Sequence, residues 1–176
     1  MRVYHVSMST IVLIGFRGSG KTTLGRWLAE ERNMSFLDTD EEVLEYLKFS
    51  SVGEAWKAIG ETGWRDAEAE VIPPLLSNEA VIALGGGAPF VEEVRKTLIH
   101  VDLVLNLTAD PEVTSSRIEA GMDRPPLSSE DLDIRLERLQ GYAQLGTHGI
   151  DTSGDLESAQ SAILHYLNNL IGHGSI

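Results

Sequence analysis

The stretch from Gly15 to Thr22 has the composition of a loop that binds phosphate. It reads Gly-Phe-Arg-Gly-Ser-Gly-Lys-Thr, which matches G-x-x-x-x-G-K-[ST], and a β-branched run at 10–14 precedes it. Glycines let consecutive backbone N–H groups converge on phosphate oxygens, and a helix after the loop points its positive end at them. Lys21 is predicted to reach the β- and γ-phosphates, and the Thr22 hydroxyl to hold Mg²⁺. The predicted nucleotide contacts in the loop are Gly18, Ser19, Gly20, Lys21, Thr22 and Thr23. The alternative is a glycine-rich turn with a solvated lysine.

Two carboxylates, Asp38 and Asp40, follow the second apolar run. P-loop ATPases usually carry a metal-binding acid at the end of a later strand, but here the run 81–84 ends in glycine. Spacing of two residues puts both carboxylates on one side of an extended segment. One can then hold Mg²⁺ through water while the other accepts a proton from a substrate hydroxyl. The alternative is that Asp40 only caps the helix that follows.

Glycines and arginines supply the remaining candidate groups. The run Gly85-Gly86-Gly87 exposes backbone N–H groups to a ligand, or forms only a tight turn. Arg65 stands one helical turn before Glu68, and this spacing alone favours a surface ion pair. Arg138 lies one turn before a tyrosine, a spacing that simple solvation also explains. Arg124 belongs to a proline-stiffened segment in which a mobile lid over the phosphates is expected.

The apolar pattern predicts alternating strands and helices, which is typical of a parallel α/β sheet. Five strands are predicted, at 10–14, 34–37, 80–84, 103–107 and 149–151. Ligands bind at the carboxyl ends of such strands. The phosphate loop, the aspartate pair, the triple glycine and the start of the last helix are all expected there.

The helix boundaries carry recognisable signals. Ser51 opens a helix with capping-box spacing, a further helix begins near Thr62, and Pro73-Pro74 ends or kinks it. A later helix restarts at Ser128 or Ser129. Its predicted inner face consists of Leu132, Leu136 and Leu139, and the apolar residues of the terminal helix are Leu156, Ile163, Leu167 and Leu170.

Composition excludes several classes of protein. A chain of 176 residues is most simply one domain, and 14 Lys and Arg against 27 Asp and Glu give a net charge of −13. Nucleic acid and anionic membranes repel such a chain. It has no cysteine, so it has neither disulfides nor thiolate metal sites. Apolar runs of about five residues are far too short to span a membrane. We therefore expect a cytoplasmic protein without nucleic-acid or membrane partners.

Taken together, these motifs resemble the shikimate kinase family. Besides the phosphate loop, that family carries D-[ST]-D, G-E-x-x-F-R-x-x-E, G-G-G, R-P-L and R-x-x-x-Y. The counterparts here begin at Asp38, Gly60, Gly85, Arg124 and Arg138, and they run in unbroken order from about Thr10 to Leu170. Departures are Trp64 for Phe, a second proline at Pro126, Gly141 within the last motif, and Pro73-Pro74.

The resemblance implies a reaction and roles for single residues. It implies transfer of the γ-phosphoryl group of ATP to the 3-hydroxyl of shikimate, with Mg²⁺ as cofactor. Asp40 would act as base and Asp38 would help to hold Mg²⁺. Arg124 would close from the lid onto the phosphates, and Arg117 would stack on adenine. The substrate would be bound by Asp40, Arg65, Arg138 and the backbone of Gly85, Gly86 and Gly87.

The resemblance also implies the architecture. The expected fold is a five-stranded parallel sheet in the order 2-3-1-4-5, flanked by helices, as in P-loop nucleoside-monophosphate kinases, and a monomer. The single kinase domain, 1–176, would carry an N-terminal extension at 1–9, a helical substrate-binding region at about 40–76 and a lid at about 122–128.

Other functions compete with this interpretation. A related small-molecule kinase, such as one for gluconate or for a nucleoside, is the nearest alternative. A nucleoside kinase would not need two arginines beside a triple glycine, whereas a kinase with a carboxylate substrate would. A GTPase is disfavoured because no N-K-x-D segment occurs. A non-catalytic nucleotide-binding regulator would be expected to lack Lys21, Asp40 or Arg124, and all three are present.

Overall fold

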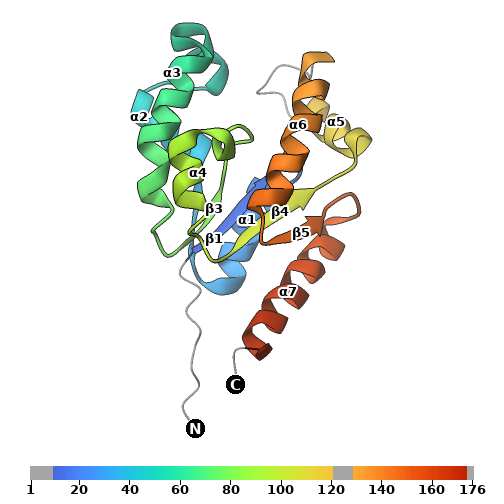
Figure 1. The fold of residues 1–176 in the computed structure, drawn as a ribbon. Helices are drawn as coiled ribbons and strands as arrows, with labels where there is room; N and C mark the ends of the chain where they lie inside the picture. Colours follow the sequence, from blue (N-terminus) through green and yellow to red (C-terminus); the bar gives the residue numbers. More distant parts are fainter. Residues whose placement is uncertain (1–9, 121–128, 174–176) are drawn as a thin grey trace.

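A single five-stranded sheet forms the centre of the protein (Figure 1). The computed structural model describes residues 10–120 and 129–173. All strand pairs are parallel, and the order is β2-β3-β1-β4-β5, as predicted. The strands are β1 Thr10–Gly15, β2 Ser35–Asp38, β3 Ala80–Ala83, β4 Val104–Thr108 and β5 His148–Asp151. The predicted extension at 1–9, and the predicted lid with Arg124, lie outside the described residues.

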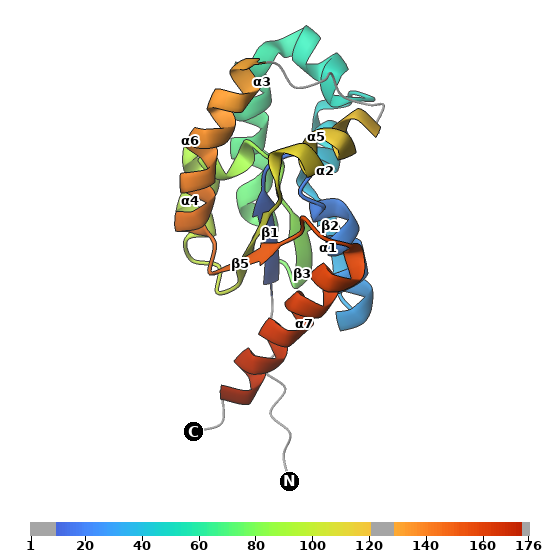
Figure 2. The ribbon, with the colours of Figure 1, turned by 90° about the vertical axis from the view of Figure 1, so that its right-hand side faces the viewer.

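Helices cover both faces of the sheet, which explains why its central strands are apolar throughout rather than alternating. On β1, Val12 and Ile14 face one helical layer, while Ile11 and Leu13 face the other. The second layer contains α1 and α7, and Figure 2 shows them together on one side of the sheet. The helices are α1 Lys21–Arg32, α2 Thr39–Leu47, α3 Val52–Leu75, the 3-10 turn η1 Ala88–Phe90, α4 Glu92–Leu98, α5 Pro111–Ala120, α6 Ser129–Leu145 and α7 Leu156–His173.

Helix α3 shows how local signals set the boundaries. The Ser51 hydroxyl accepts a hydrogen bond from the Glu54 N–H at 3.2 Å and caps the helix as predicted. The predicted second helix near Thr62 is confirmed, because non-helical backbone at Gly60, with φ 69° and ψ −179°, divides α3 into two helical segments. A positive φ favours glycine, so the break occurs there. The helix ends at Leu75, directly after Pro73-Pro74.

Three of the leucines predicted to close the core are instead exposed. Leu139, Leu156 and Leu170 expose 36%, 48% and 42% of their surface, whereas Ile163 and Leu167 are buried. Leu170 lies near the end of α7, which extends past the sheet in Figure 1, whereas Leu156 begins α7 and lines the cleft. Leu132 and Leu136 lie outside the residues whose side chains are described. Within the described residues, no helix is both long and apolar enough to cross a membrane.

Candidate active site

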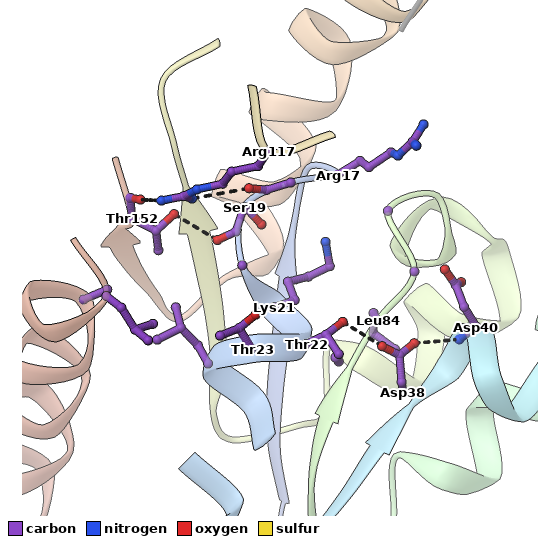
Figure 3. Close-up of a pocket in the computed structure, with 18 of the residues that line it drawn as sticks. Arg17, Ser19, Lys21, Thr22, Thr23, Asp38, Asp40, Leu84, Arg117 and Thr152 are labelled. Atoms are coloured by element: carbon purple, nitrogen blue, oxygen red, sulfur yellow. Dashed lines mark hydrogen bonds between the residues drawn. The ribbon is translucent and has the colours of Figure 1, made fainter. Parts of the chain in front are cut away.

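The phosphate loop joins β1 to α1 and adopts a conformation that depends on its glycines. Gly18 and Gly20 have φ values of 82° and 91°, in the left-handed region that side chains disfavour. A Cβ on Gly18 would also collide with the backbone oxygen of Thr114 on α5. The Lys21 ammonium donates to the carbonyl oxygens of Gly15 at 2.9 Å and Phe16 at 3.1 Å, which holds it over the loop (Figure 3).

Asp38 connects the phosphate loop to the second strand. The Thr22 hydroxyl donates to Asp38 Oδ2 at 2.8 Å, and the Asp40 N–H donates to Asp38 Oδ1 at 3.1 Å (Figure 3). Asp38 is therefore the residue that caps α2, and the alternative in which Asp40 is the cap is wrong. Asp40 itself lines the cleft, with its carboxylate directly against Gly85.

The pair Thr22 and Asp38 fits a magnesium ion bound together with a nucleotide. Among the residues that the structure describes, no three His, Asp or Glu side chains converge as a metal site of their own. Mg²⁺ is commonly held by one or two protein oxygens, phosphate oxygens and water, so a complete protein cage is not needed. A hydroxyl and a carboxylate at the mouth of a phosphate loop supply those protein oxygens.

The triple glycine follows β3 and touches functional side chains, not only solvent. The Gly85 N–H donates to the hydroxyl of buried Thr39 at 2.9 Å. A Cβ on Gly85 would collide with the Asp40 carboxylate, and one on Gly87 would collide with the Arg65 guanidinium. A side chain at either position would displace the Asp40 carboxylate or the Arg65 guanidinium, because these charged groups lie directly against the backbone.

Arg65 and Glu68 form the predicted ion pair, but it is not a surface pair. Arg65 Nη1 lies 2.6 Å from Glu68 Oε2, and Arg65 Nη2 lies 3.2 Å from Glu61 Oε1. The Glu68 side chain is only 1% exposed and that of Arg65 is 23% exposed. Burial raises the pKa of Glu68. The charge of Arg65 and hydrogen bonds from Arg65 and Trp64 oppose this rise, while the charge of the nearby Asp40 adds to it, and the pKa stays raised. Burial acts to lower the pKa of Arg65, but Glu68 and Glu61 outweigh it, so that pKa is raised.

Each predicted substrate arginine lies over an aromatic ring. The Arg65 guanidinium carbon is 5.9 Å from the centroid of the Trp56 ring, and that of Arg138 is 5.8 Å from the centroid of the Phe90 ring. Such contacts restrain the plane of a guanidinium, and in Arg65 the ion pairs with Glu61 and Glu68 restrain it further. Arg138 and Arg65 come from α6 and α3, on either side of the glycine turn.

The other end of the cleft is closed by α5 and the segment after β5. Arg117 donates to the carbonyl oxygens of Thr152 at 2.8 Å and Gly18 at 3.4 Å. The Thr152 hydroxyl lies 2.9 Å from the carbonyl oxygens of Ser19 and Thr108, so it ties the phosphate loop to β4 (Figure 3). Sequence reasoning missed Thr152, because a hydroxyl that contacts backbone oxygens leaves no pattern of residue types.

These groups surround one cleft of about 580 Å³ at the carboxyl ends of the strands. As predicted, the phosphate loop, the aspartate pair and the start of the last helix all line it. Its lining includes Gly18, Ser19, Gly20, Lys21, Thr22, Thr23, Asp38, Asp40, Gly85, Gly86, Arg117, Asp155 and Leu156. Arg65 contacts the glycine turn at Gly87, and Arg138 lies over Phe90, which directly follows that turn.

Comparison with known proteins decides the family. A model of the family "Shikimate kinase" matches residues 17–168. The chain belongs to the shikimate kinase family. Relatives with that name include one from Pelotomaculum thermopropionicum, 36% identical over 91% of this chain and 96% of its own length. Another, from Zymomonas mobilis, is 40% identical over 74% of each chain. Membership makes this protein a kinase that uses ATP.

Solved structures of shikimate kinases have the same fold. The enzyme from Acinetobacter baumannii in complex with shikimate gives a TM-score of 0.80 at 29% identity and covers 96% of both chains. The enzyme from Aquifex aeolicus gives a TM-score of 0.78 at 29% identity, over 90% of this chain and 96% of its own. A gluconokinase from Sinorhizobium meliloti matches with a TM-score of 0.60 but only 17% identity, which is a likeness of fold alone.

Proposed function

We propose that this member of the shikimate kinase family transfers the γ-phosphoryl group of ATP to the 3-hydroxyl of shikimate. One observation carries the proposal. The Asp40 carboxylate lies against Gly85, between the Thr22–Asp38 pair on one side and the Arg65–Glu68 pair on the other. A proton acceptor therefore stands between a site suited to phosphate and Mg²⁺ and a site suited to a carboxylate.

The nucleotide occupies the phosphate-loop end of the cleft in this proposal. Backbone N–H groups of the loop, with the side chains of Lys21 and Thr22, bind the phosphates. Thr22 and Asp38 hold Mg²⁺, which supplies neutralisation of the charge on the β- and γ-phosphate oxygens. Arg117 lies at the far end of the cleft, and we assign its exposed face to adenine.

Shikimate occupies the glycine-turn end. The guanidinium groups of Arg65 and Arg138 bind its carboxylate, because a planar fork of N–H donors matches two carboxylate oxygens. Gly85, Gly86 and Gly87 offer backbone groups, and the segment 40–76 supplies most of this wall. We assign Arg124, in the segment 122–128, to closure over the phosphates.

The chemical step needs one base and a fixed geometry. The 3-oxygen of shikimate forms a bond to the γ-phosphorus while the bond from that phosphorus to the β,γ-bridging oxygen breaks, and ADP leaves. Asp40 accepts the hydroxyl proton, and Lys21 stabilises the charge that develops on the transferring group. A monomeric state and a cytoplasmic location remain predictions from the sequence.

A coupled assay of ADP release tests this function. Shikimate, gluconate and a nucleoside are offered separately with ATP and Mg²⁺, and a reaction without acceptor gives the background. We expect rapid turnover with shikimate alone. Faster turnover with gluconate or with a nucleoside contradicts the proposal, and ADP release that no acceptor stimulates indicates a nucleotide-binding regulator.

A further inference from the structure

Tyr142 joins the helix that carries Arg138 to the middle of the glycine turn. It lies on α6, it is 1% exposed, and its hydroxyl donates to the Gly86 carbonyl oxygen at 2.5 Å. The two residues are 56 positions apart in sequence. The Tyr142 hydroxyl also has a hydrogen bond with the Arg138 side chain. A buried phenol with these two polar partners calls for an explanation beyond packing, since phenylalanine fills the same volume.

The acceptor of this hydrogen bond, the Gly86 carbonyl oxygen, belongs to the peptide group that joins Gly86 to Gly87. The Gly86 carbonyl and the Gly87 N–H are parts of one planar unit, so fixing one fixes the other. The Gly85 N–H is used by Thr39, but within the described part of the chain the N–H groups of Gly86 and Gly87 donate to no protein group. A hydrogen bond accepted by the carbonyl also polarises the peptide and strengthens its N–H as a donor.

The surroundings of Tyr142 hold its ring in place. Its ring centroid lies 5.2 Å from that of Phe90, with the ring planes tilted by 56°. The preceding residue, Gly141, lies so close to Phe90 that a Cβ would collide with the Phe90 ring. This close approach of α6 to η1 brings the hydroxyl within reach of Gly86. Arg138, one helical turn earlier, also lies over the Phe90 ring.

We infer that Tyr142 is a positioning residue that orients the Gly86–Gly87 peptide, so that the Gly87 N–H binds an oxygen of the acidic substrate in fixed relation to Arg138. The inference rests on the proposed function, because it concerns how that substrate is held. Tyr142 itself touches no reacting atom.

The ionisation of Tyr142 is compatible with this role. Burial raises the pKa of Tyr142 to about 12, and the charge of Arg138, a hydrogen bond from Arg138 and the charge of Arg65 oppose that rise in part. The hydroxyl therefore stays protonated and can donate its hydrogen bond throughout the neutral range.

Tyr142→Phe removes the hydroxyl and keeps the ring, and Tyr166→Phe is the matched control. Tyr166 stacks on His148 with ring centroids 3.7 Å apart, on α7 and away from the glycine turn. Loss of one neutral hydrogen bond should raise the Michaelis constant for shikimate by about 2- to 13-fold. We expect the Michaelis constant for ATP and kcat to stay within about twofold of the parent, since neither the nucleotide end nor the base is touched.

Nuclear magnetic resonance of the ligand-free protein supplies a second readout. Tyr142→Phe should shift the amide resonance of Gly87 and leave that of Gly20 unchanged, while Tyr166→Phe should shift neither. This arm needs no substrate. A parent enzyme that ignores shikimate therefore refutes the proposed function without deciding the role of Tyr142.

Three results would overturn the inference. One is a Gly87 amide that does not respond to Tyr142→Phe. Another is an equal loss for shikimate and ATP, which is the behaviour of a general packing defect. The third is an unchanged Michaelis constant for shikimate in a variant that melts at the parent temperature.

Discussion

The two ends of the cleft are built in different ways. The nucleotide end comes mostly from one continuous stretch, Gly15 to Thr23, and uses its backbone N–H groups and short-range contacts. The glycine-turn end, to which we assign the acidic substrate and which we call the acid end, combines residues from four parts of the chain. They are Asp40 on α2, Arg65 on α3, Gly85–Gly87 in the turn after β3, and Arg138 on α6. The first end is fixed by local geometry and the second by side-chain contacts across the fold. Substitutions at one end should therefore leave binding at the other nearly intact.

Lys21→Ala should give the largest effect, a loss of turnover by at least about 10³-fold, because no ammonium remains to offset charge on the transferring phosphoryl group. Nucleotide affinity should fall less than turnover does, since the backbone of the loop is unchanged. Initial rates and calorimetric ATP binding measure the two quantities. Turnover near that of the parent contradicts the assignment of the phosphate loop.

Asp40→Asn should lower kcat by about 10²–10⁴-fold, the usual range for loss of a general base. Asp38, and not Asp40, caps α2, so the variant should melt close to the parent temperature. ATP affinity should also stay close to that of the parent. An Asp40→Asn enzyme that turns over within a few-fold of the parent contradicts the role of base.

Most of the nucleotide end could be predicted because its signal is local. The spacing of Gly15, Lys21 and Thr22 implies the loop, and the Asp38 partner of Thr22 follows a strand that the apolar pattern reveals. Thr152 escaped prediction because its hydroxyl contacts backbone oxygens, such as that of Ser19, which every residue possesses. No pattern of residue types marks such a contact.

The acid end could be predicted only as a set of residues, not as an arrangement. The spacing of Arg65 and Glu68 gave their ion pair, but burial of Glu68 depends on how α3 packs under the glycine turn. The contact between Tyr142 and Gly86 joins distant segments through a carbonyl, so no sequence spacing encodes it. Leu156 shows the opposite error, in which a sequence pattern predicts burial that the fold does not provide. Its helical spacing predicted a core position, but it lines the cleft and is exposed.

The variants of the two arginines assigned to the substrate should differ in thermal stability. Loss of one charge-assisted contact costs roughly 1.5–3 kcal/mol, so Arg65→Met and Arg138→Met should each raise the Michaelis constant for shikimate by about 10- to 150-fold. Only Arg65→Met also leaves a buried carboxylate, Glu68, without its nearest cation, so it should melt at a lower temperature.

A second substitution separates the two effects of Arg65. Adding Glu68→Gln to Arg65→Met should recover melting temperature without recovering affinity for shikimate. Thermal melts and steady-state kinetics of the single and double variants check this. Equal melting temperatures for Arg65→Met and Arg138→Met would show that the ion pair with Glu68 contributes little to stability.

Tyr142 should have the smallest effect on stability, visible only in alkali. Its folded pKa of about 12 lies above the value of about 10 for an exposed tyrosine, so the folded state favours the neutral phenol. The stabilisation is complete below pH 10 and is lost as the pH rises toward 12. At most about 2–3 kcal/mol is involved, from two pKa units at 1.36 kcal/mol each. Denaturant unfolding at pH 9 and above should show the parent losing more stability than Tyr142→Phe.

The claim that the acid end binds a carboxylate is tested most directly by comparing shikimate with its methyl ester. The ester keeps every hydroxyl but removes the negative charge and one strong acceptor that Arg65 and Arg138 are proposed to bind. With saturating ATP, kcat/KM for the ester should fall by about 10- to 150-fold in the parent enzyme. The preference for the acid over the ester should be smaller in Arg65→Met and in Arg138→Met, because only one of the two cations remains in each. An ester that the parent phosphorylates as well as the acid would contradict the account.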